Sequence, residues 1–436
     1  MAVRRHVSGS SVVVPAVDTA SSTAAIRSLG RAGVRVVGVS EHETPPGFAS
    51  KYCEETVAVP DPESDLSGYG AALLGLAKRS DVETILPLCE EDVYVLARNK
   101  QAFAAHVGTP WPSFETLRAV QDRVRLFEAA RSAGVPAPAT SDFDDWDDRD
   151  AGVVVKPRYT VPSDEYDARF AGVSPDEYTS VYVSPDEEVS RDDLVAAMGH
   201  VPIVQEYVST PDEYGFFALY DHGEAVATFQ HRQRRGWKYC GGPSAYRESV
   251  DIPELEAAGL RLLDELDWHG VAMVEFLRDP ETGTFKLMEV NPRFWSSLPF
   301  TIQAGVDFPA LYWQQATGGS VETPPDYDVG VAGHLLWGEV LHLQSILRDD
   351  YPLVERPSFL RSLADVAGSL VRSPRFDYLD RRDPGPFLRD LRNRLPVRRL
   401  FSPGATPHAP SGETDDRHDA ADGRSDDPDL ATVDGP

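Results

Sequence analysis

The chain has 436 residues, of which 41% are hydrophobic, so it has room for two or three domains with a substantial core. No apolar run approaches the roughly 18 residues of a membrane span, and the N-terminus leads into a strand-like run rather than a secretory leader, which excludes an integral membrane protein. A net charge of −28 weighs against nucleic acid as a partner, and three cysteines without metal-ligand spacing indicate a reducing, cytoplasmic compartment.

The first part of the chain, residues 1–115, alternates strand-like and helix-like patterns. This alternation predicts a Rossmann-like α/β domain. The turn after the first strand lacks Gly-x-Gly-x-x-Gly, so a dinucleotide site is disfavoured. The expected elements are a strand at 12–14, a helix over 20–32, a strand over 34–39, a helix near 69–78, a strand over 83–88 and a helix from Glu90.

Glu90 and Glu91 follow the end of the strand at 83–88. Substrates of open α/β sheets bind at such strand ends, so the two carboxylates are candidates for orienting an amine. Carboxylates at a helix N-terminus are also common caps, and both interpretations stay open.

Lys156, one of only six lysines, ends the apolar run 151–155. An ammonium at the end of a buried strand can hold a phosphate, whereas the alternative is a lysine that reaches water with its tip. A second apolar run, 201–208, ends in polar residues and is followed by a fresh strand over 216–220. The edge between these two runs can hydrogen-bond a flat base.

The segment 273–293 has the pattern of two strands joined by a Pro/Gly turn. With the turn centred on Glu281, Glu275 is expected to pair near Leu287, and alternation places four polar side chains on one face. Two carboxylates and an amide oxygen there suit Mg²⁺; a solvated acidic hairpin is the alternative. The four side chains are Glu275, Glu289, Asn291 and Arg293.

These motifs, together with a helix and Gly-Val-Pro-Ala-Pro-Ala-Thr over 120–140, resemble the ATP-grasp superfamily in order and spacing, across about residues 115–320. The resemblance implies a mixed α/β and α+β fold that holds MgATP between two subdomains, here expected at 116–203 (the lid side) and 204–325 (with the metal hairpin). Residues 1–115 would be the pre-ATP-grasp domain that usually precedes them.

The resemblance also implies roles for individual residues. Lys156 and Arg123, the latter standing where the family usually has lysine, would contact the α and β phosphates of ATP. Arg293 would face the transferred phosphate beside Lys156 as a catalytic residue. The expected base and ribose contacts are Gln205, Glu206, Val208 and Glu213, with Asp212 a rival for the ribose, and the expected ligands of one or two Mg²⁺ (or Mn²⁺) ions are Glu275, Glu289 and Asn291.

Two segments depart from the pattern or extend it. The family closes a short glycine-rich loop over the phosphates, but residues 158–185 are long, acidic and tyrosine-rich, with Gly172 as their only glycine. Either this segment supplies substrate contacts and closes differently, or the nucleotide site is looser. The cluster 231–244 predicts an anion-binding loop over the acceptor site, with a surface basic patch as the alternative and Cys240 as a small filler. Its candidate substrate residues are Arg232, Arg234, Arg235, Gly241 and Gly242.

Beyond residue 326 the pattern becomes helical, and residues 333–400 are expected to form a helical extension that packs rather than reacts. The acids of 377–387 are interpreted as caps and turns. Residues 401–436 are predicted to be a disordered acidic tail. The acidic excess, 70 Asp and Glu against 42 Lys and Arg, favours a halophilic protein, since molar salt shortens the Debye length to about 3 Å; an ordinary acidic protein with a charged tail is the alternative.

The sequence therefore predicts an ATP-grasp ligase that activates a small-molecule carboxylate and joins it to an amine. Two alternatives stay open: an ATP-binding regulatory or scaffold protein without turnover, and a Rossmann-type NAD oxidoreductase. No motif specifies the two substrates. The oligomeric state is not specified either, and a homodimer is one possibility.

Overall fold

The computed structural model describes residues 9–143, 146, 152–170, 178–185, 187, 189–210, 212–319, 321 and 326–394. The expected tail, 401–436, lies outside these residues. Among the described residues, no helix is long and apolar enough to cross a membrane.

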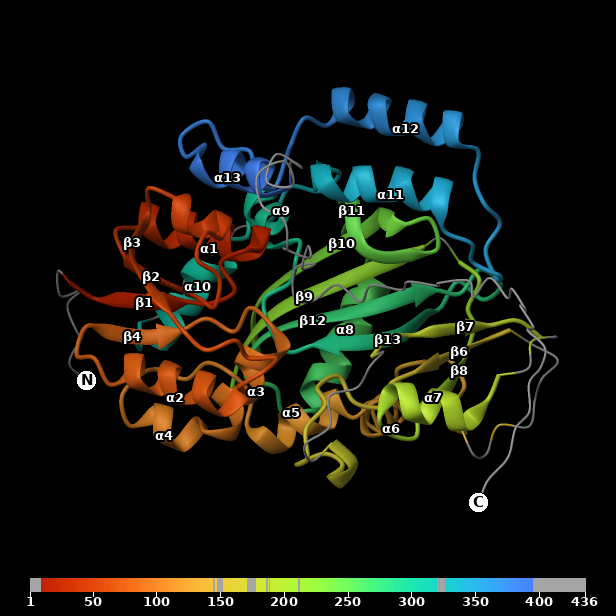
Figure 1. Cartoon of the computed structure of the whole chain (residues 1–436), viewed down its shortest axis with the longest axis horizontal. Helices are drawn as coiled ribbons and strands as arrows, with labels where there is room; N and C mark the ends of the chain where they lie inside the picture. Colours follow the sequence, from red (N-terminus) through yellow and green to blue (C-terminus); the bar gives the residue numbers. More distant parts are fainter. Residues whose placement is uncertain are drawn as a thin grey trace, which may run out of the picture.

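A four-stranded parallel sheet with the order β3-β2-β1-β4 forms the N-terminal domain, seen in red and orange in Figure 1. The central strands are apolar on both faces because helices cover both, as in other parallel sheets. This arrangement confirms the predicted Rossmann-like domain. Its elements are β1 Ser11–Val14, α1 Ala20–Arg31, β2 Arg35–Ser40, η1 Pro46–Ala49, β3 Cys53–Ala58, α2 Leu66–Ala77, β4 Val82–Ile85, α3 Glu90–Arg98 and α4 Lys100–Ala104.

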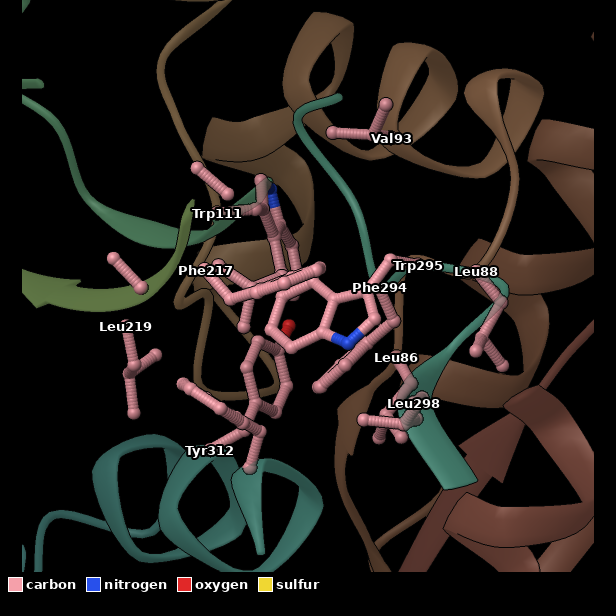
Figure 2. Packing of buried hydrophobic residues seen from close by; sticks show 14 of the residues in the cluster. Leu86, Leu88, Val93, Trp111, Phe217, Leu219, Phe294, Trp295, Leu298 and Tyr312 are labelled. Atoms are coloured by element: carbon pink, nitrogen blue, oxygen red, sulfur yellow. The ribbon is translucent and has the colours of Figure 1, made fainter. Parts of the chain in front are cut away.

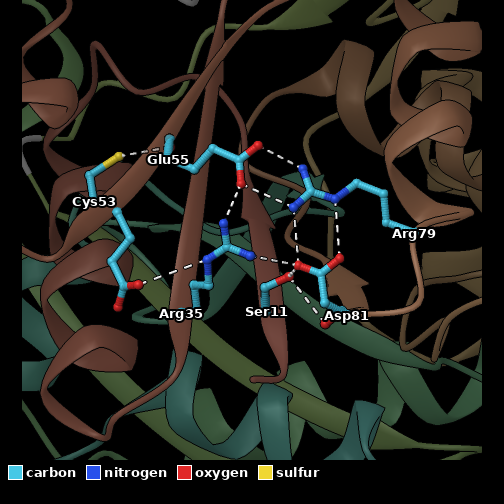
Figure 3. A network of polar contacts seen from close by, with 7 residues as sticks. Ser11, Arg35, Cys53, Glu55, Arg79 and Asp81 are labelled. Carbon is cyan, nitrogen blue, oxygen red and sulfur yellow. Dashed lines mark hydrogen bonds and ion pairs between the residues drawn. The ribbon is translucent and has the colours of Figure 1, made fainter. Parts of the chain in front are cut away.

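The amino ends of these strands are tied together by a charged network (Figure 3). Arg35 bonds Glu55 at 2.6 Å and Asp81 at 2.8 Å, and Arg79 bonds the same two carboxylates. Ser11 at the start of β1 donates to Asp81 at 2.9 Å. Because several strands share the network, it fixes the amino ends of the parallel strands. Glu90 lies at the opposite end of the sheet, after the carboxyl end of β4.

A small antiparallel sheet with the order β5-β8-β6-β7 follows, with its own apolar cluster. Two helices precede this sheet in the chain, and Asp122 lies between them. Its side chain accepts from the Val124 N–H at 3.1 Å and caps the second helix. The elements are α5 Phe114–Gln121, α6 Arg123–Ser132, β5 Thr140–Asp142, β6 Val153–Lys156, η3 Ala168–Phe170, β7 Val181–Val183, α7 Arg191–Met198 and β8 Ile203–Glu206.

A six-stranded antiparallel sheet, β13-β12-β9-β10-β11-β14, forms the centre of the molecule, drawn in green in Figure 1. Helix α11 packs against β10 and β11 with α12 above it, and α13 lies beside the N-terminal domain, where it contacts η1 (Figure 1). The elements are β9 Glu213–Asp221, β10 Glu224–Lys238, β11 Gly241–Ser249, α8 Pro253–Glu265, β12 Gly270–Arg278, β13 Phe285–Asn291, α9 Leu298–Gln303, α10 Phe308–Ala316, β14 Ala332–His334, α11 Leu336–Arg348, α12 Phe359–Arg372 and α13 Gly385–Arg394.

Within the described residues, the predicted helical extension is confirmed by α11, α12 and α13 but is wrong at its start. Residues 332–334 form a strand instead, with Tyr246 of β11 opposite His334. Small, buried residues at 332 and 333 let this short segment complete the open edge of β11, a pairing that helical periodicity cannot reveal.

One apolar cluster joins the N-terminal domain to the central sheet (Figure 2). Leu86 and Leu88, which follow β4, pack with residues 294–298, and the Phe294 N–H donates to the Pro87 carbonyl at 2.9 Å. The hydroxyl of Tyr312 donates to the Ile85 carbonyl at 3.0 Å. The carboxyl end of β4 is therefore held rigidly beside the end of β13.

Candidate functional site

Lys156 ends β6 and points toward the acidic side chains of the central sheet. Its ammonium donates to Oε1 of Gln205 at 2.9 Å, and burial lowers its pKa to about 8. The charge of Arg123 contributes to this lowering, whereas Glu289, Glu275 and Glu213 act in the opposite direction. These mutual effects place two cations and three carboxylates, predicted from separate motifs, in one site.

Arg123 begins α6 and links the two sheets directly. One guanidinium nitrogen donates to the Pro157 carbonyl at 2.6 Å, and the other lies 3.4 Å from Oε2 of Glu289. The arginine that replaces the expected lysine therefore bridges the strand of Lys156 and the acidic hairpin.

The hairpin β12–β13 has a different register from the predicted one. Glu275 pairs with Glu289, and Leu287 pairs with Phe276. The register shifts between Glu275 and Phe276, so Met288 is the additional residue of a β-bulge, which strict alternation from an assumed turn cannot anticipate. The correction brings the two carboxylates opposite each other, which is closer than the prediction required.

The carboxylates of this hairpin are confined together. Burial, with the neighbouring charges of Glu289 and Glu213, raises the pKa of Glu275 to about 8 against the opposing effect of Arg293. Asn291 donates from Nδ2 to Oε1 of Glu275 at 3.0 Å. Two carboxylates and an amide at one point form a donor set that fits a hard divalent cation, whose charge would relieve their repulsion.

Arg293 lies just beyond β13 and bonds to the N-terminal domain. Its Nε donates to Oε1 of Glu90 at 2.9 Å, and a terminal nitrogen donates to Oδ1 of Asn291 at 3.0 Å. Burial opposes its charge, but the carboxylates of Glu90, Glu289 and Glu275 outweigh this effect and raise the pKa of Arg293. Glu90 thus contacts the predicted catalytic arginine.

Two further residues of this region were not predicted. Gln121 ends α5 and donates from Nε2 to Oε2 of Glu90 at 2.9 Å. The hydroxyl of Tyr166 donates to Oε1 of Gln121 at 2.5 Å. Gln121 lies in the motif of residues 120–140 but had no predicted role, and Tyr166 was visible only as one tyrosine of the segment 158–185.

The expected base-binding residues lie at the end of β8. Gln205 is buried, and its amide bonds Lys156 and the hydroxyl of Thr140 at 3.0 Å. Glu206 is exposed, with Oε1 accepting from Lys286 at 3.2 Å. Val208 is buried. Gln205 and Glu206 end β8, and Val208 lies in the connection from the small sheet to the central one.

The two rivals for a ribose contact differ in their surroundings. Asp212 forms an ion pair with Arg232. Burial raises the pKa of Glu213 to about 7, against the opposing effects of the Lys156 charge and of a hydrogen bond from Gln233. The effect of Lys156 places Glu213 near its ammonium group. Of the two acids, Glu213 is the one associated with the site.

The predicted anion-binding loop 231–244 is instead a β-hairpin, formed by the end of β10 and the start of β11. Its arginines pair with carboxylates of the same chain: Arg232 with Asp212, Arg234 with Glu248 at 2.7 Å, and Arg235 with Glu339 at 2.8 Å and 3.1 Å. These carboxylates are distant in sequence, so a count of local charges made the segment look like an unpaired cationic loop.

The tip of this hairpin approaches the site. Gly241 and Gly242 have φ of +131° and +82°, and a side chain on Gly241 would begin 2.7 Å from Oε1 of Glu213. The positive φ favours glycine at residue 241, and any side chain there would also displace the carboxylate of Glu213. Cys240, beside it, is partly buried.

The described part of the segment 158–185 packs against the small subdomain. The Arg158 guanidinium bonds both carboxylate oxygens of Asp122 at 2.9 Å, and the Arg158 N–H donates to Nε2 of His200 at 2.8 Å. Three rings, Tyr159, Phe170 and Tyr178, surround His200. Whether the segment closes over phosphates stays a prediction, since residues 171–177 lie outside the described ones.

Three layers meet at this site: a parallel N-terminal sheet and two antiparallel sheets that bring a lysine strand, an arginine and an acidic hairpin together. This is the ATP-grasp fold. The chain is similar to the biotin carboxylase domain of Hydrogenobacter thermophilus 2-oxoglutarate carboxylase in complex with MgADP, ADP and bicarbonate (17% identity, 74% of this chain and 73% of that one, TM-score 0.55). It is also similar to N5-carboxyaminoimidazole synthetase from Staphylococcus aureus (14% identity, 74% and 81%, TM-score 0.51).

A third similar structure, Rhizobium etli pyruvate carboxylase, is much longer: this chain covers 28% of it, with 72% of this chain aligned, 17% identity and a TM-score of 0.53. No protein-family model matches the chain, and no curated protein matches it. At these identities the likeness shows the fold.

Proposed function

We propose that the protein is an ATP-dependent carboxylate–amine ligase. The γ-phosphoryl group of ATP passes to a substrate carboxylate, and the amine displaces phosphate from the resulting acyl phosphate to give an amide, ADP and phosphate. One observation carries the proposal: Lys156 and Arg123, from the small subdomain, interact with Glu213, Glu275 and Glu289 of the central sheet.

The two cations would bind the α and β phosphates of the nucleotide. Burial lowers the pKa of Lys156 in the free protein, and incoming phosphates would raise it again and strengthen the ammonium form. Gln205, Glu206 and Val208 would contact the base and Glu213 the ribose. The solved Hydrogenobacter structure, with MgADP and bicarbonate bound, supports nucleotide binding by this fold.

Glu275, Glu289 and Asn291 would hold Mg²⁺, or Mn²⁺. When bound, the ion supplies positive charge that shields the phosphate oxygens. Arg293 would stabilise the negative charge that develops on the transferred phosphoryl group. The chain's own residues thus provide cations around the phosphates and acids that carry the ion.

The hairpin tip would border the acceptor substrate. Gly241 and Gly242 form its turn, and the backbone of Gly241 lies against Glu213, so the tip would also border the ribose. Arg232, Arg234 and Arg235 would act from behind it, and their ion pairs would have to loosen for direct contact with a substrate carboxylate.

Glu289→Gln tests the reaction. We expect ADP release in the presence of carboxylate and amine to fall at least 100-fold while the circular dichroism spectrum and melting temperature are retained. Glu115→Gln is the matched control, since Glu115 is exposed and pairs with Arg125 outside the cation–carboxylate cluster. Unchanged ADP release by Glu289→Gln would contradict the proposal.

Calorimetry separates the ligase from the two alternatives. MgATP that binds at least tenfold more weakly to Lys156→Ala than to the wild type supports the nucleotide site. ATP binding without turnover over a panel of carboxylates and amines would favour a regulatory or scaffold protein, an alternative supported by the segment 158–170, which packs on His200 and Asp122 rather than forming a glycine-rich lid. Binding of a nicotinamide dinucleotide instead would favour an oxidoreductase.

We further propose that the protein works in the cytoplasm of a halophilic cell. A net charge of −28 supports this proposal, and unfolding in low salt with activity in molar KCl is the expected behaviour. Equal stability in both would contradict it. A homodimer is testable by light scattering in the same buffers.

A further inference from the structure

A continuous series of side-chain hydrogen bonds joins the segment after Lys156 to the acidic hairpin. Tyr166 donates to Gln121 at 2.5 Å, and Gln121 donates to Glu90 at 2.9 Å. Glu90 accepts from Arg293 at 2.9 Å. Arg293 donates to Asn291, and Asn291 to Glu275, each at 3.0 Å.

We propose that Glu90 is a positioning residue that holds Arg293 for the transferred phosphoryl group, and that Gln121 and Tyr166 fix Glu90 in turn. This inference rests on the proposed function. It gives the N-terminal domain, through the carboxyl end of β4, a part in the chemistry of the central sheet.

The donors and acceptors of the series hold the Arg293 guanidinium in a single orientation. Both oxygens of Glu90 are occupied, one by Arg293 and one by Gln121. Three guanidinium nitrogens of Arg293 donate once each within the protein, to Glu90, Asn291 and the Phe294 carbonyl. A guanidinium has five N–H groups, so two are left, one on each terminal nitrogen, for an anionic ligand. Glu90 therefore determines which way those remaining donors face.

A purely structural role for the Glu90–Arg293 pair is disfavoured by the packing around it. The end of β4 and residues 294–298 are already joined by the apolar cluster of Figure 2, and the Phe294 N–H bonds the Pro87 carbonyl. The side chains of Glu90 and Arg293 are 18% and 24% exposed to solvent, whereas the residues of that apolar cluster are buried. Loss of the Glu90 charge should leave the domains together and release the guanidinium.

The test compares Glu90→Gln with Tyr166→Phe and with the control Glu165→Gln, whose exposed pair with Arg98 lies one residue from Tyr166. We expect Glu90→Gln to lower kcat for ADP release at least tenfold with KM for ATP within twofold, Glu90→Asp to recover part of the loss, and Tyr166→Phe to lower kcat two- to fivefold. Glu165→Gln should match the wild type. Wild-type kcat in Glu90→Gln, or a loss confined to melting temperature, would overturn the proposal.

A crystal structure of Glu90→Gln separates this proposal from the ligase reaction. If the wild type binds MgATP but releases no ADP with any substrate pair, the ligase proposal fails. The position of Arg293 in the variant still decides whether Glu90 positions it. A guanidinium that leaves Asn291 supports the positioning role. One that stays in place overturns it.

Discussion

Lys156→Met should make the free protein more stable while it weakens ATP binding. A pKa that falls from 10.5 to about 8 corresponds to roughly 3 kcal/mol against the charged ammonium in the folded chain. Methionine removes that cost but also the bond to Gln205, worth about 1 kcal/mol. The expected net gain in the free energy of unfolding at pH 7 is about 2 kcal/mol.

The pH dependence of this gain has a definite sign. Below pH 8 Lys156 is protonated in both the folded and the unfolded chain, so the full cost is present. Between pH 8 and pH 10.5 the folded chain loses the proton first, the unfolded chain binds more protons, and wild-type stability rises. The advantage of Lys156→Met should therefore shrink over this window.

Urea unfolding of the wild type and Lys156→Met at pH 7 and pH 10 measures both effects, with calorimetric titration of MgATP on the same samples. Lys78→Met, at the exposed end of α2, is the control. A variant less stable than the wild type at pH 7, or an equal advantage at both pH values, would refute the reasoning that burial of the charge dominates.

Three further substitutions follow from buried groups. Burial, followed by the charge of Arg247, lowers the pKa of His231 to about 3, so below pH 6.5 the unfolded chain binds a proton that the folded chain does not, and the free energy of unfolding decreases as the pH is lowered. His231→Gln should therefore lose about 2 kcal/mol less of this free energy than the wild type between pH 7 and pH 5 in urea melts. An identical loss would contradict this account. Asp383→Ala leaves Arg27 buried without its partner and should cost about 3–5 kcal/mol, against under about 1 kcal/mol for the exposed Glu115→Ala. Gly241→Ala should lower both melting temperature and MgATP affinity, because its new side chain meets Glu213; wild-type affinity would show that the hairpin tip lies away from the nucleotide.

Local patterns in the sequence were sufficient for much of the fold. The N-terminal βαβ unit follows from hydrophobic runs that lie within a few tens of residues of one another. The same holds for the strand of Lys156 and for the acidic hairpin, where each strand carries its own signature. The motif order then placed these pieces in one site.

What the sequence did not reveal depends on distant partners or on local irregularity. The bulge at Met288 changes the register without leaving a residue type that marks it. Arg235 looked like an unpaired cation because its partner, Glu339, is 104 residues away. The role of Gln121 is visible only once α3 and β13 are side by side, since its contact with Glu90 has no sequence pattern.

The buried pair of Arg27 and Asp383 joins side chains 356 residues apart. At a synthesis rate of about 5–20 residues per second, Arg27 leaves the ribosome roughly 20–70 s before its partner exists. During that time the first domain holds a cation whose burial is not yet compensated, so nascent chains should stay open at α1 until Asp383, just before α13, is made. The last described helix thus completes the domain that was synthesised first.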